Sequence, residues 1–385
     1  MIRMLYRILC ITVSLFVVWP SCSEETKNLL NSGLSFYPRA IRLSHPIDSR
    51  NNNGVVVSVT GSNNRADIYF RQTDRGEFQK ISEISDPDFV FQFCCGTIFE
   101  LPADIGRIRA GSLIWAGSIG KANAPSPKGI KIFLSEDSGH TWRPLPASCV
   151  ATGARCPFTL ESGNPGIWEP EFTLASDGAL VMYYSDETGQ PARNQSIQHV
   201  RTYDLTTWRD ISPVVASAVP ADRPGMAVLR TLKNGSRFMT WENCGPASCA
   251  VFYKTSRDGW DWGRPDEIDP KWAIHLPDGR YFEHAPNNAV TSDGWIVVIG
   301  QILYDKDGKS ALGSGETLFI NKSGDPGREW EGVKAPVSIK DVRNDFCPNY
   351  SSSLLVSVDG HSIEEFSSDY KNGVCVTFYG TGEKY

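Results

Sequence analysis

One short motif recurs along the chain at intervals too regular for chance. Its clean form, Ser-x-Asp-x-Gly-x-Thr-Trp, covers residues 135–142, and a shortened form covers residues 256–262. Weaker copies end at Phe78, Trp208 and Trp330, so the terminal aromatic residues at positions 78, 142, 208, 262 and 330 are 64, 66, 54 and 68 residues apart. Self-similarity of this kind indicates a repeat architecture in which each repeat is one supersecondary unit.

The motif has a structural explanation that needs no catalysis. Its Asp carboxylate can accept backbone N–H bonds inside a tight turn, and its Gly supplies a positive φ. The closing Trp can then pack between neighbouring sheets. We therefore interpret the motif as a turn that fixes each repeat.

A second repeated signal lies between the copies of the motif. Asp-Gly or Asn-Gly pairs occur at positions 177–178, 234–235, 293–294 and 359–360, and an alternating or apolar run follows each pair. Such pairs are typical of β-hairpins. Each unit then contains four strands, which is the composition of a propeller blade.

Five units carry the motif and a sixth follows near the C-terminus. We therefore predict an all-β fold, a single six-bladed β-propeller spanning residues 30–385. The sixth unit ends before its outer strand. We predict that residues 34–43 supply this strand, because joining both ends of the chain in the last blade closes the ring and removes exposed edges.

The first 23 residues have the pattern of a signal peptide. Arg3 and Arg7 precede an apolar stretch of 12 residues at positions 8–19, which is too short to span a bilayer. We predict cleavage near Ser23 and a secreted protein. No later segment is long and apolar enough to span a membrane.

Composition and charge narrow the classes of molecule that the protein could bind. The net charge is −6 and the chain has no long basic run, which argues against nucleic acid as a partner. The 11 Trp and 13 Tyr residues suit the stacking of sugar rings, although aromatic residues also suit strands. We predict an oligo- or polysaccharide partner, no cofactor, no metal site and a monomer.

Eight cysteines remain after the signal peptide, and an even number in a secreted protein favours disulfides. Spacing suggests the pairs Cys149–Cys156, Cys244–Cys249 and Cys347–Cys375. For the adjacent Cys94 and Cys95, a vicinal disulfide and two separate buried cysteines are both open. Four glycosylation sequons fit a secreted glycoprotein: Asn194, Asn234, Asn321 and Asn349.

Polar residues at the start of the inner strands point to chemistry, because these strands line the channel of a propeller. Cleavage of a glycosidic bond needs two carboxyl groups, one to protonate the leaving oxygen and one to attack the anomeric carbon or activate water. Glu169 and Glu242 are the best pair, since each follows a Trp in adjacent blades. Glu171 shares the strand face of Glu169, so either could point inward.

Further residues of blades three to five are candidates for substrate binding. They lie on the predicted inner strands or at the ends of the second strands, with blade five contributing residues 282–288. The candidates are Trp168, Tyr184, Asp186, Arg223, Trp241, His284 and Asn287. We also place the Cys94-Cys95 pair on the inner strand of blade two, as part of the binding wall.

The ordered motifs between residues 168 and 245 resemble those of family 93 glycoside hydrolases. They are Trp-Glu-Pro at 168–170, Tyr-Tyr-Ser-Asp-Glu at 183–187, Arg-Pro-Gly-Met at 223–226 and Glu-Asn-Cys-Gly at 242–245. The resemblance implies an exo-acting arabinanase with a six-bladed, sialidase-like fold and a retaining mechanism. Glu169 and Glu242 match the two catalytic glutamates of the family, and Tyr350 matches a positioning tyrosine by its blade position.

Local context suggests roles for the two glutamates. Trp168 and Pro170 would desolvate Glu169 and raise its pKa, which suits a general acid. Arg223 would keep Glu242 ionised as the nucleophile, and the reverse assignment of the two roles is also open. The sequon at Asn349 is a departure from the family, because a glycan beside Tyr350 would crowd the channel.

Two rival functions remain. A sialidase clamps its substrate carboxylate with three arginines, but only Arg223 has a convincing channel position, since Arg39 and Arg42 fall in the predicted closing strand. A non-catalytic sugar-binding propeller would need no opposed carboxylates. A structure in which Glu169 and Glu242 face one closed-ended pocket would favour the exo-hydrolase.

Overall fold

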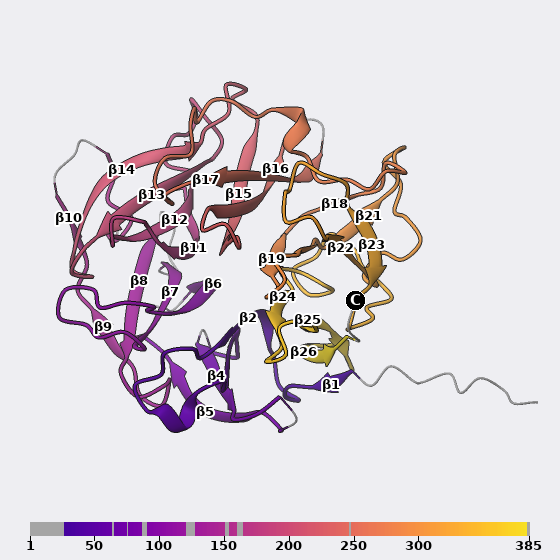
Figure 1. The fold of residues 1–385 in the computed structure, drawn as a ribbon. Helices are drawn as coiled ribbons and strands as arrows, with labels where there is room; N and C mark the ends of the chain where they lie inside the picture. Colours follow the sequence, from indigo (N-terminus) through magenta and orange to yellow (C-terminus); the bar gives the residue numbers. More distant parts are fainter. Residues whose placement is uncertain are drawn as a thin grey trace, which may run out of the picture.

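Six β-sheets are arranged radially around a common axis in the computed structural model of the chain (Figure 1). The structure describes residues 27–63, 65–74, 76–86, 91–120, 128–150, 154–159, 165–245 and 248–382. Each sheet is a blade that runs from an inner strand beside the axis to an outer strand, which confirms the predicted six-bladed propeller. The signal peptide predicted at residues 1–23 lies outside the described residues.

Within each blade, the strands follow one another from the axis outward. Blade one contains β2 (Phe36–Arg42), β3 (Val55–Thr60), β4 (Ala66–Arg71) and β5 (Gln79–Ile84). Blade two contains β6 (Phe91–Glu100), β7 (Leu113–Gly120), β8 (Lys128–Ser135) and β9 (Arg143–Leu145). Blade three contains β11 (Ile167–Leu174), β12 (Leu180–Asp186), β13 (Ser196–Thr202), β14 (Thr207–Val215) and β10 (Ser148–Cys149), the last parallel to β14.

The second half of the ring follows the same plan. Blade four contains β15 (Arg223–Thr231), β16 (Arg237–Cys244), β17 (Cys249–Ser256), β18 (Tyr281–Glu283) and β21 (Ile302–Tyr304). Blade five contains β19 (Asn287–Val290), β20 (Ile296–Ile299), β22 (Thr317–Asn321) and β23 (Glu331–Lys334). Blade six contains β24 (Ser353–Val356), β25 (Ile363–Lys371), β26 (Val374–Thr381) and β1 (Asn28–Leu29). Two 3₁₀ turns, η1 (Ser49–Asn51) and η2 (Pro270–Trp272), complete the elements.

The repeated motif forms the turn that its sequence predicts. In the clean copy, Asp137 accepts hydrogen bonds from the backbone N–H and the hydroxyl of Thr141 at 2.9 and 2.6 Å. The indole of Trp142 donates to the hydroxyl of Ser82 in the preceding blade at 3.1 Å. Trp208, Trp262 and Trp330 likewise pack in clusters that include the blade before their own. The motif therefore fastens each blade to its neighbour.

The ring is closed by an N-terminal strand, but the predicted segment was wrong. Residues 34–43 hold β2, the inner strand of blade one. The closing strand is β1, which pairs Asn28 with Tyr379 and Leu29 with Phe378 of β26. An outermost strand needs only one neighbour and can be two residues long, so it leaves little trace in the sequence.

Blade five also differs from the prediction. Residues 282–288 do not form one inner strand, because β18 pairs with β17 in blade four, where Glu283 faces Ala250. The chain then turns through His284 and Ala285, whose φ angles are 64° and 45°, and the inner strand begins at Asn287. Two consecutive residues in the left-handed region interrupt a strand, and this conformation is uncommon for such residues.

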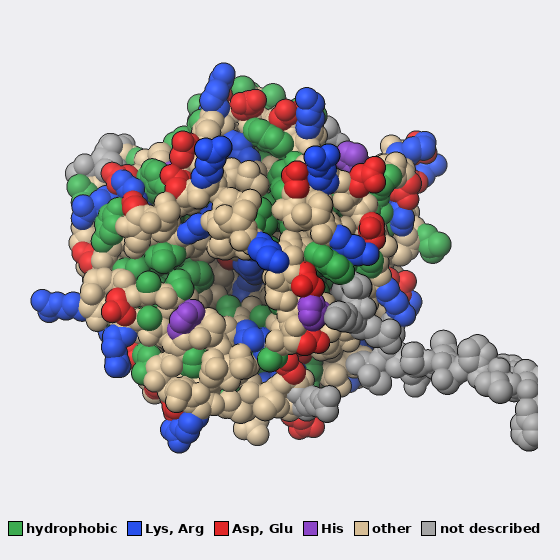
Figure 2. All heavy atoms as spheres, viewed as in Figure 1, with side chains coloured by type: hydrophobic (Ala, Val, Ile, Leu, Met, Phe, Trp, Pro, Cys, Tyr) green, Lys and Arg blue, Asp and Glu red, His purple; other side chains and the backbone are tan. Residues whose placement is uncertain are grey.

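Every blade has a left-handed residue within its inner strand or just before it. These residues are Tyr37, Cys95, Glu169, Met226, Ala285 and Ser351, with φ between 45° and 62°. In blades one to four the residue lies within a β-bulge, where the pairing register shifts. A bulge re-aims the neighbouring side chains. The repetition places six re-aimed positions around the axis, where the space-filling view shows a central hollow (Figure 2).

Four disulfides connect the eight cysteines of the described residues, in the predicted pairs and with Cys94 joined to Cys95. Cys347–Cys375 ties the segment before β24 to β26. Within the described residues, no helix has the length and apolar character needed to cross a membrane.

Candidate active site

Glu169 and Glu242 line one pocket of about 350 Å³ at the axis of the propeller. Glu169 lies at the bulge of β11, and Glu242 lies on β16 in the next blade. Three other predicted site residues, Trp168, Arg223 and Tyr350, line the same pocket. The remaining wall comes from Cys94, Cys95, Glu187, Gln195 and Cys244.

The carboxylate of Glu169 is held by two donors. Its Oε2 accepts a hydrogen bond from the hydroxyl of Ser185 at 2.6 Å and another from the backbone N–H of Met226 at 3.1 Å. Burial raises the pKa of Glu169, and these two hydrogen bonds oppose part of this rise because they favour the ionised form. The left-handed backbone of Glu169, with φ of 55°, sets the direction of the side chain.

The carboxyl group of Glu242 accepts a hydrogen bond from one donor, whereas that of Glu169 accepts from two. Its Oε2 accepts the backbone N–H of Ala285 at 2.6 Å. Burial raises the pKa of Glu242 to about 7, and the negative charge of Glu169 adds to this rise. Glu242 therefore has fewer donors that favour its ionised form than Glu169 has. This difference favours the reverse of the roles suggested by sequence context, in which Glu169 was the acid.

Arg223 does not act as the partner expected for Glu242. Its guanidinium forms an ion pair with Glu187 and donates to the side-chain oxygen of Gln195 at 2.9 Å. The Arg223 side chain is 46% exposed, so it lies at the rim of the pocket. Its charge lowers the pKa of Glu242 only as a minor influence beside burial.

Tyr350 lies against both carboxylates. Burial raises the pKa of its hydroxyl well above the usual value, and the charges of Glu242 and Glu169 raise it further. The hydroxyl therefore stays protonated and contacts the sulfur of Met226 at 3.5 Å. The ring of Tyr37, which sequence reasoning missed, lies 6.2 Å from the ring of Tyr350.

The buried position of Asn349 removes the conflict with its sequon. Its side-chain nitrogen donates to the carbonyl oxygens of Gly300 and Gln301 at 3.2 and 2.8 Å. The side chain is 1% exposed. The folded protein therefore has no room for a glycan on Asn349, and Tyr350 can face the pocket.

Four predicted binding residues lie away from the pocket. Tyr184 and Trp241 are buried in the cores between blades, because they alternate along their strands with Ser185 and Glu242. Asp186 caps a turn by accepting the backbone N–H of Thr188 at 2.7 Å. Asn287 is fully buried on β19.

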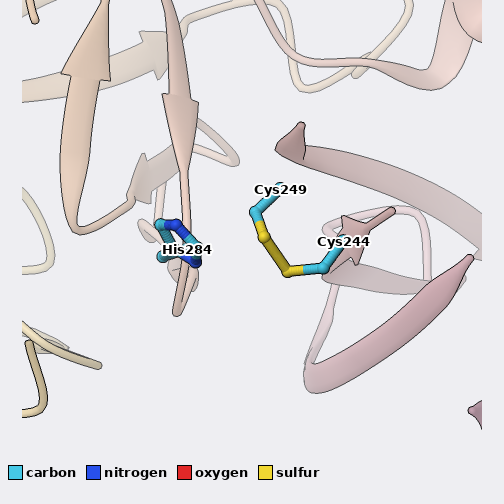
Figure 3. Close-up of side chains that lie close together, drawn as sticks. All are labelled: Cys244, Cys249 and His284. Carbon is cyan, nitrogen blue, oxygen red and sulfur yellow. A yellow bond between two sulfur atoms is a disulfide. The ribbon is translucent and has the colours of Figure 1, made fainter. Parts of the chain in front are cut away.

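His284 borders the site from the side of Glu242. Its Nδ1 lies 4.0 Å from the Oε2 of Glu242, and burial lowers its pKa, which favours the neutral ring. His284 also lies beside Cys244 and Cys249, with candidate ligand atoms within 4.8 Å of one another (Figure 3). Because the two sulfurs are joined in a disulfide, they offer no thiolate, and this group is not a metal site.

Glu169 and Glu171 both point toward the axis but into different cavities. Glu171 accepts the hydroxyl of Thr97 at 2.9 Å and pairs with Arg230 at 3.2 Å. It lines a second cavity, which shares no lining residue with the pocket of Glu169. The bulge between the two glutamates separates them, so only Glu169 faces Glu242.

Arg39 and Arg42 lie on the inner strand β2 and also line the second cavity. The sequence interpretation that put them near a closing strand was therefore wrong. Among the arginines of the described residues, only Arg223 lines the glutamate pocket. A clamp of three arginines on one carboxylate is not assembled there, which disfavours the sialidase alternative.

Comparison with solved structures confirms the resemblance to family 93 at the level of the fold. An α-L-arabinofuranosidase of Fusarium graminearum from this family, solved with arabinobiose, matches with a TM-score of 0.71 and 19% identity, covering 93% of this chain and 98% of the other. An α-L-arabinanase of Penicillium chrysogenum, also with arabinobiose, matches with a TM-score of 0.70 and 21% identity, covering 92% and 97%. No protein-family model and no curated protein matches the sequence.

Proposed function

We propose that the chain is a secreted glycoside hydrolase that acts from the chain end of α-1,5-linked arabinan, or of a related plant or cell-wall glycan, by a retaining mechanism. The observation that carries this proposal is the pair of buried carboxyl groups, Glu169 and Glu242, on one pocket. Such a pair is the machinery of glycoside cleavage. The signal-like N-terminus and the four disulfides support secretion.

The hydrogen bonds around the carboxyl groups support one assignment of roles. Glu242, with its pKa raised to about 7, donates a proton to the leaving oxygen. Glu169, held by Ser185 and the N–H of Met226, attacks the anomeric carbon as a carboxylate and forms the glycosyl-enzyme. Glu242 then deprotonates the water that breaks this bond. The protonated hydroxyl of Tyr350 positions the nucleophile or the sugar.

The form of the pocket supports action at a chain end. Beneath the carboxylates, Tyr37, Cys95, Met226 and Ala285 pack with Tyr350 into one apolar cluster across the axis. This cluster gives the pocket a floor, which suits a terminal sugar better than the middle of a polymer. The arabinobiose bound by the two fungal enzymes of the same fold supports an arabinose-type ligand.

The test is hydrolysis of debranched α-1,5-arabinan by the purified protein and by its Glu169→Gln and Glu242→Gln variants. We expect arabinobiose or arabinose to be released by the wild type and release to fall at least 10³-fold in both variants. Glu365→Gln is the matched control, because Glu365 is a fully buried carboxyl group on β25 outside the pocket. Its activity should equal that of the wild type.

Two results would contradict the proposal. If either pocket variant retained full activity, the two-carboxylate mechanism would be wrong. If the wild type released nothing from arabinan or from a panel of plant glycans, but still bound them, the protein would be a sugar-binding propeller.

A further inference from the structure

A second cavity of about 620 Å³ lies on the axis, on the other side of the bulges from the glutamate pocket. All six inner strands, β2, β6, β11, β15, β19 and β24, contribute to its wall. We call it the basic chamber, because its charged lining residues are four arginines and two glutamates: Arg39, Arg42, Arg230, Arg237, Glu100 and Glu171. The hollow at the centre of the ring shows Lys and Arg side chains on its walls (Figure 2).

Arg39 is one of the two buried charges of this set, together with Glu171. It is 7% exposed, and its guanidinium donates to the carbonyls of Pro38 and Ser351 and to the Ser351 hydroxyl at 2.9 to 3.1 Å. Its Nε has no hydrogen-bond partner. No carboxylate of the described residues forms an ion pair with Arg39. The chamber therefore holds a buried cation satisfied only by neutral acceptors.

The surroundings of Arg237 and Arg230 do not compensate the positive charge of Arg39. Arg237 donates to the carbonyl oxygens of Leu174 and Gly235, and it too has no carboxylate partner in the described part of the chain. Arg230 pairs with Glu171 at 3.2 Å. Burial lowers the pKa of Arg230, the charge of Glu171 raises it, and the charge of Arg39 lowers it, so the two guanidinium groups act on each other.

Arg42 is compensated by a carboxylate outside the chamber, whereas Glu100 is held by neutral donors. Arg42 pairs with Asp74 at 2.7 Å, and Glu100 accepts the backbone N–H groups of Ser44 and His45 at 2.8 and 3.0 Å. What remains inside is three guanidinium groups against the two carboxylates of Glu171 and Glu100. Uncompensated buried charge is costly, whereas guanidinium groups bind anions through strong charge-assisted hydrogen bonds.

We propose that the basic chamber binds a small monoanion, held between Arg39 and Arg230. The chemistry fits either a halide or the carboxylate of a small organic acid, since apolar side chains such as Phe172 and Leu229 form much of the remaining wall. This site is distinct from the glutamate pocket and does not depend on the proposed hydrolase activity. Its tests accordingly need no turnover.

The first test is a crystal of the wild-type protein soaked in sodium bromide. We expect an anomalous peak between Arg39 and Arg230, and a weaker one there in the Arg230→Gln variant. A chamber without bromide in the wild type would overturn the proposal for a halide. A soak in bromoacetate would then test whether a carboxylate binds. Absence of both anions would overturn the proposal.

The second test measures the melting temperature in rising concentrations of sodium chloride and sodium acetate. We expect a rise of roughly 2 °C at ten times the dissociation constant of the anion that binds. The chloride series tests a halide and the acetate series tests a carboxylate, so the two series show which kind of anion binds. Identical melting temperatures at all concentrations of both salts would contradict the proposal.

Two variants that change the chamber charge in opposite directions exclude a purely structural effect. Arg230→Gln removes a positive charge and should weaken anion binding about tenfold, whereas Glu171→Gln removes the competing carboxylate and should strengthen it by a similar factor. Both variants lose the same ion pair, so a general loss of stability would move them together. Arg143→Gln, an exposed arginine on β9, is the control and should bind as the wild type does.

Discussion

The backbone N–H of Ala285 donates a 2.6 Å hydrogen bond to the carboxyl group of Glu242, across the boundary between blades four and five. Ala285 can do so because its φ of 45° turns the N–H toward the axis. Met226 holds Glu169 in the same way from the next left-handed position of the ring. The repeated left-handed positions thus supply a backbone donor to each carboxyl group of the site.

The first prediction concerns the pH dependence of kcat/KM. Glu242 must be protonated to act as the acid, and its pKa is about 7, so activity should fall as the pH rises through 7. The positive charge of Arg223 lowers the pKa of Glu242, so Arg223→Gln should move this alkaline limb to higher pH. If the alkaline limb of the variant lay at the same or a lower pH, measured on the same arabino-oligosaccharide, the assignment of Glu242 as the acid would be contradicted.

The second prediction concerns Tyr350. Its hydroxyl has only the weak acceptor Met226 Sδ, so Tyr350→Phe should leave the melting temperature almost unchanged. If the hydroxyl donates to the nucleophile or the sugar in the transition state, kcat should fall about 10²-fold. Paired measurements of kcat and melting temperature separate this role from packing, because a packing residue would lower the second value.

The third prediction concerns the disulfide between Cys94 and Cys95, which lines the glutamate pocket. Cys95 also packs in the apolar cluster of the pocket floor. Replacing both residues by Ser removes an apolar contact surface for the sugar ring, so KM should rise about tenfold while kcat changes less. The matched control is the double Ser variant of Cys149 and Cys156, a disulfide outside the pocket. Equal KM values in the two variants would rule out the contact.

The fourth prediction concerns stability. Burial raises the pKa of Glu365 from its usual 4.5 to about 8, so the folded protein keeps a proton that the unfolded chain has already lost. The stability contributed by this proton is complete below pH 4.5 and is lost as the pH rises through 8. Glu365→Gln should therefore stabilise the protein by roughly 3 kcal/mol at pH 8 and much less at pH 4. Urea unfolding at the two pH values measures the difference, and a variant less stable at pH 8 would refute it.

Local signals in the sequence were sufficient for most of the fold. The turn around Asp137 and the glycine hairpins depend on residues close together in the chain, and their spacing gives the number of blades. The closing strand β1 was missed because two residues carry no periodic pattern. The division of residues 282–288 between two blades follows from the left-handed His284 and Ala285, which side-chain preferences do not predict.

The site was predictable only in part. Glu169 and Glu242 were found because each follows a Trp on a channel-side strand of adjacent blades, and because their motifs resemble those of family 93. Tyr184 and Trp241 were misplaced because strand alternation turns them away from the face that carries Ser185 and Glu242, a rule that the sequence interpretation did not apply to them. The donors to the two carboxyl groups include backbone N–H groups. Every residue except proline has such a group, so no sequence motif identifies the ones that bind the carboxylates.

The last prediction separates the roles of the two glutamates by rescue with sodium azide, using an aryl arabinofuranoside as substrate. Glu169→Gly fits the left-handed backbone at this position and removes the proposed nucleophile without strain. Azide can then attack from the side where the nucleophile stood, so the arabinosyl azide should have the inverted anomeric configuration. In Glu242→Gly, Glu169 still forms the glycosyl-enzyme and azide displaces it, so the product should have the retained configuration. NMR of the two products decides the assignment, and the opposite pattern would restore Glu169 as the acid.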